Sequence, residues 1–156
     1  MKLELKHLAP YLPYQLKGIF YDNEHSVKQI VTIELLHIPD ELTIINSESE
    51  WNIYLSEFKP ILRRLSDLER GEQGNHVTQH KINLLLGEDN KYGDFLFSHY
   101  RGYLTALTKS NQTGYTYIPL KLTNRMLELL FADHFDVFGL IDAGLAIDIN
   151  TIAPTK

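Results

Sequence analysis

Short runs of β-branched and aromatic residues, separated by polar turn residues, mark the first third of the chain. Residues 15–21 and 27–38 are two such runs, and the Asp-Asn-Glu-His sequence at 22–25 between them has the composition of a turn. This pattern predicts a β-hairpin. The second run is β-forming at consecutive positions from Ile30 to Ile33, so both faces of the strand carry suitable residues, which favours a central strand.

The next apolar runs extend the predicted sheet and then end it. Strands are predicted at 42–45 and 51–55, on either side of a polar, acidic loop. In the following run, 57–68, Pro60 lacks a ladder donor and therefore suits a sheet edge or the exit from a sheet. Two glycines and several charges at 69–75 form the clearest internal break in the chain.

Helical spacing becomes frequent after this break. Large apolar residues recur at intervals of three and four between Leu96 and Leu107, which predicts a helix over 94–107. A further helix is expected to begin after Thr123, whose hydroxyl can cap the first amides. A last helix is expected to begin after Asp136 and to end with Gly144 at its C′ position.

The sequence therefore predicts an α+β fold, with an N-terminal antiparallel sheet of about four strands, curled or closed into a small barrel, and a mainly helical C-terminal half. One domain, 1–156, would contain a mainly β subdomain, 1–70, and a mainly α subdomain, 76–156. The expected core collects large apolar side chains from both: Ile19, Ile30, Ile33, Leu35, Trp51, Ile61, Leu104, Leu127, Leu130, Phe131, Phe138 and Ile141.

Composition and charge narrow the possible settings. The chain has 156 residues, no cysteine, and 15 Lys and Arg against 20 Asp and Glu, for a net charge of −5. That charge has the wrong sign for a protein that holds nucleic acid mainly by phosphate neutralisation. Residues 1–7 alternate charge with leucine, unlike a secretory signal, and the apolar runs are short for a bilayer. We expect a cytoplasmic protein without membrane contact and without disulfides.

Histidines provide the first candidate chemistry. His76 and His80 are four residues apart and would share one helix face, as zinc ligands can. A zincin-like helix also needs a glutamate beside the first histidine, but Val77 is there, so we assign neither a metal site nor a cofactor. His134 and Asp136 could be drawn as an acid–base pair, yet a helix-terminal role for His134 and a capping role for Asp136 are favoured.

Two kinds of binding surface can be drawn from the remaining residues. Lys59, Arg63 and Arg64 are the most concentrated positive charge, near aromatic residues that could stack on single-stranded nucleic acid, although acidic neighbours dilute the field. Tyrosine favours protein interfaces, and candidates for partner contact are Tyr11, Tyr14, Tyr115 and Tyr117. Because the sequence lacks a phosphate loop and a Gly-x-Ser-x-Gly elbow, no catalytic residue is assigned.

Three long strings carry a family resemblance. They are His-Leu-Ala-Pro-Tyr-Leu-Pro-Tyr-Gln-Leu-Lys at 7–17, Phe-Lys-Pro-Ile-Leu-Arg-Arg-Leu-Ser-Asp-Leu at 58–68, and His-Phe-Asp-Val-Phe-Gly-Leu-Ile-Asp-Ala-Gly-Leu-Ala-Ile-Asp-Ile-Asn at 134–150. Together they resemble small phage and prophage proteins of Bacteroidetes. Those proteins often have proline where this chain has Arg64, which leaves the chain path after Leu62 less constrained here.

The resemblance implies a phage or mobile-element protein in a bacterial host, and it implies no reaction. The leading hypothesis is therefore a non-catalytic accessory protein that binds another protein. Two alternatives stay open: a nucleic-acid-binding module that uses Lys59, Arg63 and Arg64, and a metal-dependent hydrolase that uses His76 and His80. The sequence does not specify an oligomeric state.

Overall fold

The computed structural model divides the chain into two compact units. Unit 1 contains residues 1–63 and 140–156, and unit 2 contains residues 64–139. The structure describes residues 1–22, 27–37, 40–45, 49–68, 82, 95–100, 103–110, 114–116 and 123–152, with backbone alone for 22, 27–28 and 95–116. This division differs from the predicted consecutive subdomains, 1–70 and 76–156, because residues after Gly139 belong to unit 1 again.

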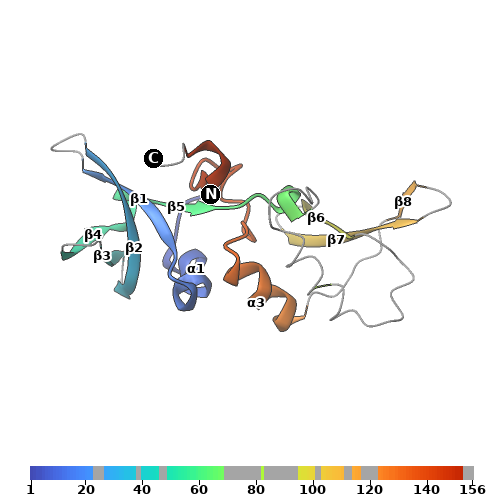
Figure 1. Cartoon of the computed structure of the whole chain (residues 1–156), viewed down its shortest axis with the longest axis horizontal. Helices are drawn as coiled ribbons and strands as arrows, with labels where there is room; N and C mark the ends of the chain where they lie inside the picture. The colour runs from blue at the N-terminus through green and yellow to red at the C-terminus, as the bar shows by residue number, and fades with distance from the viewer. Residues whose placement is uncertain are drawn as a thin grey trace. The chain divides into compact units, whose positions relative to one another are not determined.

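Unit 1 is built on a six-stranded mixed sheet in the order β4-β3-β2-β1-β5-β9 (Figure 1). The strands are β1 (Lys17–Asp22), β2 (Val27–His37), β3 (Glu41–Ile45), β4 (Glu50–Tyr54), β5 (Phe58–Leu62) and β9 (Ile147–Asp148). Neighbours are antiparallel except β9, which runs parallel to β5. The α+β class, the first hairpin and the third and fourth strands are confirmed. The small barrel is wrong, because the sheet is open.

One face of this sheet is covered by the N-terminal helical segment, α1 (Leu5–Leu8) and η1 (Ala9–Tyr14), which contacts β2. Leu8, Tyr11 and Leu16 are fully buried. The prediction that Tyr11 contacts a partner protein is therefore wrong. Burial of large apolar side chains away from water stabilises the fold, and the covered face contains the buried apolar residues of β2, β3 and β4: Val31, Ile33, Leu42, Ile44 and Ile53.

The expected core is confirmed in part. Ile33, Ile61 and Leu130 are buried, whereas Ile30 and Leu35 are about half exposed, at 48% and 52%, so their assignment to the core is wrong. β2 is interior to the sheet as predicted, but only one of its faces is covered. The side chain of Leu104 is outside the described residues. The other expected core residues are half-buried: Ile19, Trp51, Leu127, Phe131, Phe138 and Ile141.

β5 shows how proline is accommodated in this sheet. Pro60 lies opposite Gly18 of β1, and the parallel pairing with β9 begins only at Ile61, after the residue that lacks an N–H. The ring of Phe58 packs directly over Gly18, where a β-carbon would also lie 2.6 Å from the carbonyl oxygen of Lys59. Two short 3-10 helices, η2 (Leu55–Glu57) and η4 (Ile149–Thr151), directly follow β4 and β9.

Unit 2 contains strands where helix was expected. β6 (Phe95–Tyr100), β7 (Tyr103–Ser110) and β8 (Gly114–Thr116) form an antiparallel sheet, in which Tyr100 is opposite Tyr103. The helix predicted over 94–107 is therefore wrong. Its aromatic and β-branched residues also satisfy a strand, and cross-strand pairing outweighs the three-and-four spacing.

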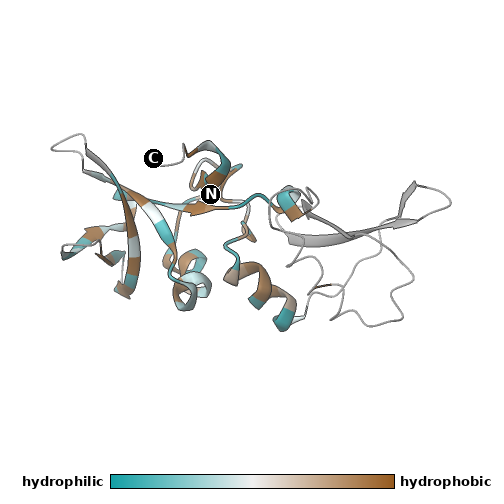
Figure 2. Cartoon of the chain, in the orientation of Figure 1, coloured by the Kyte–Doolittle hydropathy of each residue, from teal (hydrophilic) through white to brown (hydrophobic). Residues whose placement is uncertain are grey.

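The helix predicted after Thr123 is confirmed as α3 (Asn124–Ala132), and the Thr123 hydroxyl accepts a hydrogen bond from the Met126 amide at 3.3 Å. α3 packs its apolar side (Figure 2) into the core of unit 2. This core also includes η3 (Leu65–Leu68). The buried members are Leu65, Leu68, Ile82, Met126, Leu130, Phe135 and Val137.

His134 ends α3 in a Schellman motif. It has a left-handed backbone, with φ of 57°, and its amide donates to the Phe131 carbonyl at 3.0 Å, while the Phe135 amide donates to the Leu130 carbonyl at 2.9 Å. The predicted helix-terminal role of His134 is therefore confirmed. The helix expected after Asp136 is wrong, since residues 137–144 form turns.

His7 caps the first turn of α1 through an unprotonated ring nitrogen. Its Nδ1 accepts a hydrogen bond from the Glu4 amide at 3.1 Å, and its own amide donates to the Glu4 carbonyl at 2.9 Å. Burial, and secondarily the charge of Lys6, lowers the pKa of His7, while Glu4 raises it by less. The neutral imidazole is thus the form that belongs to the folded state.

We expect unit 1 to lose stability as the pH falls below the ordinary histidine pKa of 6.5 toward the lower pKa of folded His7. In this window the unfolded chain binds a proton that the folded chain does not, so the stability contributed by His7 is present above it and is lost on acidification. Denaturant midpoints across this pH range measure the effect. In His7→Gln, whose amide oxygen can accept the same bond without titrating, the pH dependence should shrink; an unchanged pH profile would assign it to other groups.

Candidate interaction surface

Among the side chains that the structure describes, the strand register places the exposed large apolar residues of the sheet on one face. Residues directly opposite each other share a face, so the pairs Ile33–Ile44 and Leu42–Ile53 belong to the covered face. By the alternation of side chains, Ile45 and Tyr54 then point to the opposite face. We call this opposite face of β2, β3 and β4 the open face.

A β-bulge determines the position of Leu35. The register between β2 and β3 shifts between Ile33 and Leu35, so Leu35 is opposite Thr43 and lies on the open face, although it follows the buried Ile33 by two residues. Ile30 lies on the same face, one position away from buried Val31. Figure 2 shows hydrophobic residues along these strands.

The four side chains are unusually exposed for their type. Ile30, Leu35, Ile45 and Tyr54 have 48%, 52%, 38% and 57% of their surface accessible. Single exposed apolar residues are common on proteins, but apolar residues gathered on one sheet face mark a contact surface more often than scattered ones do. The open face is therefore a candidate site for another polypeptide.

A chain of hydrogen bonds crosses the open face between these residues. The Thr43 hydroxyl donates to Asn52 Oδ1 at 2.8 Å and lies 2.7 Å from His37 Nε2. With the single Thr43 proton donated to Asn52, the contact with His37 corresponds to the tautomer that carries its proton on Nε2. The three side chains hold one another in fixed orientations, and Thr43 is buried beneath its neighbours. Such a set presents ordered polar groups amid apolar ones.

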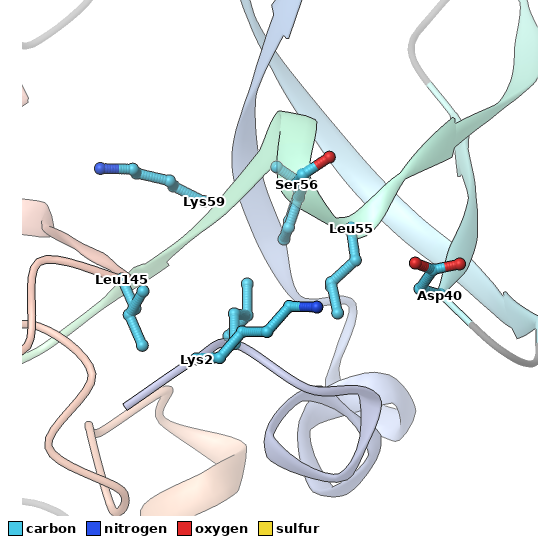
Figure 3. A pocket seen from close by; sticks show the side chains of 8 residues that line it. Lys2, Asp40, Leu55, Ser56, Lys59 and Leu145 are labelled. Atoms are coloured by element: carbon cyan, nitrogen blue, oxygen red, sulfur yellow. The ribbon is translucent and has the colours of Figure 1, made fainter.

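A hollow of about 200 Å³ in unit 1 is a second candidate (Figure 3). Its lining combines an apolar floor with charged and polar residues: Lys2, Leu3, Asp40, Leu55, Ser56, Phe58, Lys59 and Leu145. The Lys59 ammonium donates to the Gly144 carbonyl oxygen at 2.9 Å. None of these eight residues is a histidine, and the lining holds one carboxylate, so the hollow can bind a small group but contains no carboxylate pair or imidazole base.

The residues proposed for nucleic-acid contact are not gathered in one unit. Lys59 and Arg63 belong to unit 1, where Lys59 is exposed and Arg63 half-buried, and Arg64 is an exposed residue of unit 2. The nucleic-acid alternative stays a prediction.

Most of the tyrosine and histidine candidates lie outside the described side chains. Tyr14 is half-buried, and Tyr115 lies in β8, where the backbone alone is described. Tyr117, His76 and His80 are outside the described residues. Among the residues that the structure does describe, no three His, Asp or Glu side chains are grouped as metal ligands would be.

Sequence reasoning assigned Ile30 and Leu35 to the core and did not single out Ile45. The signal that could have found the open face is the alternation of strands β3 and β4, read together with the hairpin registers. No sequence signal located the bulge that turns Leu35 outward.

Comparison with known proteins adds no relative. No family model matches the chain, and neither a curated protein nor a solved structure shows significant similarity to it. Within the described part of the chain, no helix has the length and apolar character needed to cross a bilayer.

Proposed function

We propose that this chain is a non-catalytic accessory protein of a phage or mobile element and that it acts by binding a protein through the open face. The observation that supports this proposal is the gathering of four half-exposed apolar side chains on one uncovered sheet face. The resemblance of residues 7–17, 58–68 and 134–150 to phage proteins supports the genomic setting.

The apolar area of the open face is enough for a contact of moderate affinity. Complete burial of such a side chain contributes roughly 1.5–3 kcal/mol, so covering the remaining half of four of them contributes about 3–6 kcal/mol. Association costs about 4 kcal/mol or more in lost translational and rotational freedom. The apolar centre alone therefore roughly balances that cost. Specific binding must also use the polar groups of the face, such as His37, Thr43 and Asn52.

A pull-down from cells of the bacterial host tests the proposal. A tagged wild-type chain is compared with two variants. Leu35→Lys places a charge on the open face, and the matched control Ala9→Lys adds the same charge at an exposed position of η1, on the covered side of the sheet. We expect at least one protein, or an untagged copy of the chain itself, to be retained by wild type and Ala9→Lys and to be lost tenfold or more with Leu35→Lys, because a buried unpaired lysine opposes binding.

Equal retention by Leu35→Lys and Ala9→Lys would contradict the proposal. Far-UV circular dichroism of both variants shows whether each is folded, and the half-exposed position of Leu35 leads us to expect that both are.

A further inference from the structure

We propose that the protein seated on the open face is a second copy of this chain, packed sheet to sheet about a two-fold axis that runs parallel to the strands. This inference rests on the proposed function of the open face and names its partner. It is carried by the distribution of charge across the face, which is complementary to itself under this symmetry.

The registers define a row of open-face residues that crosses four strands. Lys17 of β1 is opposite Thr32 of β2, Thr32 is opposite Ile45 of β3, and Ile45 is opposite Glu50 of β4. The two ends of the row are thus a base and an acid, and both are exposed. The uncharged residues Thr32 and Ile45 lie between them.

A two-fold axis between β2 and β3 maps this row onto itself in reverse. Rotation about an axis parallel to the strands keeps the position along the strands and exchanges left and right across the sheet. Glu50 of one copy then lies over Lys17 of the second copy, and Lys17 of the first lies over Glu50 of the second. Each opposite-charge contact is made twice, as an isologous interface requires.

The same two-fold rotation also determines which residues face each other in the other rows of the open face. Further along the strands, His37 of β2 is opposite Glu41 of β3, so His37 of each copy lies over Glu41 of the other. In the row between, Leu35 lies over Thr43 of the second copy. Uncharged side chains therefore face one another in the rows of Thr32 and Leu35, and acidic side chains face basic ones in the pairs Lys17–Glu50 and His37–Glu41, so these described pairs bring no like charges together. Ile30 and Tyr54 lie beyond the overlap of the two copies.

Sheet packing gives this arrangement ordinary dimensions. Two sheets pack face to face about 10 Å apart, and an axis inclined by about 15° to the strands gives the usual crossing angle of roughly 30°. β1 pairs with residues 27–32 of β2, and β3 pairs with residues 32–37, so all four strands overlap only in the row of Thr32. The footprint of the two copies is therefore centred on β2 and β3, roughly 10 Å wide and roughly 20 Å long, with the Lys17–Glu50 contacts at its edges. An area of this size is below that of stable dimers, so we expect a weak dimer that forms toward the upper end of the protein concentrations used.

Sedimentation of the full-length chain over a wide concentration range tests the inference. We expect a monomer–dimer equilibrium for wild type and for the control Ala9→Lys. Glu50→Lys and Lys17→Glu should each weaken the dimer by about tenfold or more, because each reversal creates two like-charge contacts per dimer. Leu35→Lys should leave a monomer.

Mixing the two charge variants provides the decisive measurement. In a heterodimer of the Glu50→Lys chain with the Lys17→Glu chain, both symmetry-related contacts again pair opposite charges, so the mixture should dimerise about as well as wild type. The double variant Glu50→Lys, Lys17→Glu should also regain the dimer. A surface that is merely adhesive would show neither rescue.

A chain that stays monomeric at all concentrations overturns the second-copy inference. So does a dimer that tolerates Leu35→Lys, or charge variants that show no rescue on mixing. These outcomes leave the proposed function standing if the pull-down still retains a different protein that depends on Leu35. If Leu35→Lys also leaves that retention unchanged, both proposals fail.

Discussion

Replacing Phe135 by alanine is expected to lower the free energy of unfolding of unit 2 by about 3–5 kcal/mol. Phe135 is fully buried in the core of this unit and directly follows the left-handed residue that ends α3. Its amide bonds to the Leu130 carbonyl at 2.9 Å, and both side chains belong to the same buried cluster. Removal of the ring would leave a cavity at the point where the chain reverses after the helix, and the backbone bonds there restrict collapse around it.

The measurement needs a signal from unit 2. The single tryptophan, Trp51, belongs to unit 1. Hydrogen exchange of the α3 amides therefore reports the effect better than tryptophan fluorescence does.

Phe138→Ala is the matched control for Phe135→Ala. Phe138 is half-buried and stacks on Phe131, with ring centroids 5.9 Å apart, so its truncation should cost only about 1–2 kcal/mol. Equal costs for the two variants would show that burial of Phe135 is not what stabilises the end of α3.

Replacing Gly18 by alanine is expected to cost unit 1 about 1–3 kcal/mol. A methyl group at this position would overlap the ring of Phe58 and would lie 2.6 Å from the Lys59 carbonyl oxygen. The ring is 2% exposed and the carbonyl belongs to the neighbouring strand, so neither can move without disturbing the pairing of β1 with β5. The denaturant midpoint followed by Trp51 fluorescence measures the loss.

Two further variants separate overlap from backbone strain. Gly144→Ala adds a methyl group where no atom lies within 4 Å. Its cost in unfolding free energy, about 1 kcal/mol, therefore comes only from the left-handed φ of 71°. Phe58→Leu should cost less in the Gly18→Ala background than in wild type, because it removes part of the overlap. Additive costs would show that the ring is not the obstacle.

The parts of the fold that could be predicted depend on local chemistry. The hairpin of β1 and β2 follows from two β-forming runs around a polar turn, and α3 follows from Thr123, whose hydroxyl accepts the Met126 amide. The end of α3 at His134 was also foreseeable from helix-end chemistry. In each case the residues that decide the structure lie within a few positions of one another.

The parts that could not be predicted depend on distant partners. β9 has two residues and is a strand only because Ile61 and Leu62 lie beside it. The run from 95 to 107 satisfies either a helix or a strand until its pairing partner is known. The open face required the registers of four strands and a bulge after Ile33, so the positions of Leu35, Lys17 and Glu50 relative to one another could not be obtained from spacing.

In the sequence, unit 2 is inserted between the two segments of unit 1, and this order has a consequence for synthesis on the ribosome. The outer side of β5 pairs with Ile147 and Asp148, which are translated after all of residues 64–139. Until those codons are read, Ile61 and Leu62 in the nascent polypeptide present a strand edge without its neighbour. Translation of residues 147–148 therefore adds the β9 edge of the sheet, and a ribosome that stalls within residues 64–139 holds an incomplete, aggregation-prone intermediate.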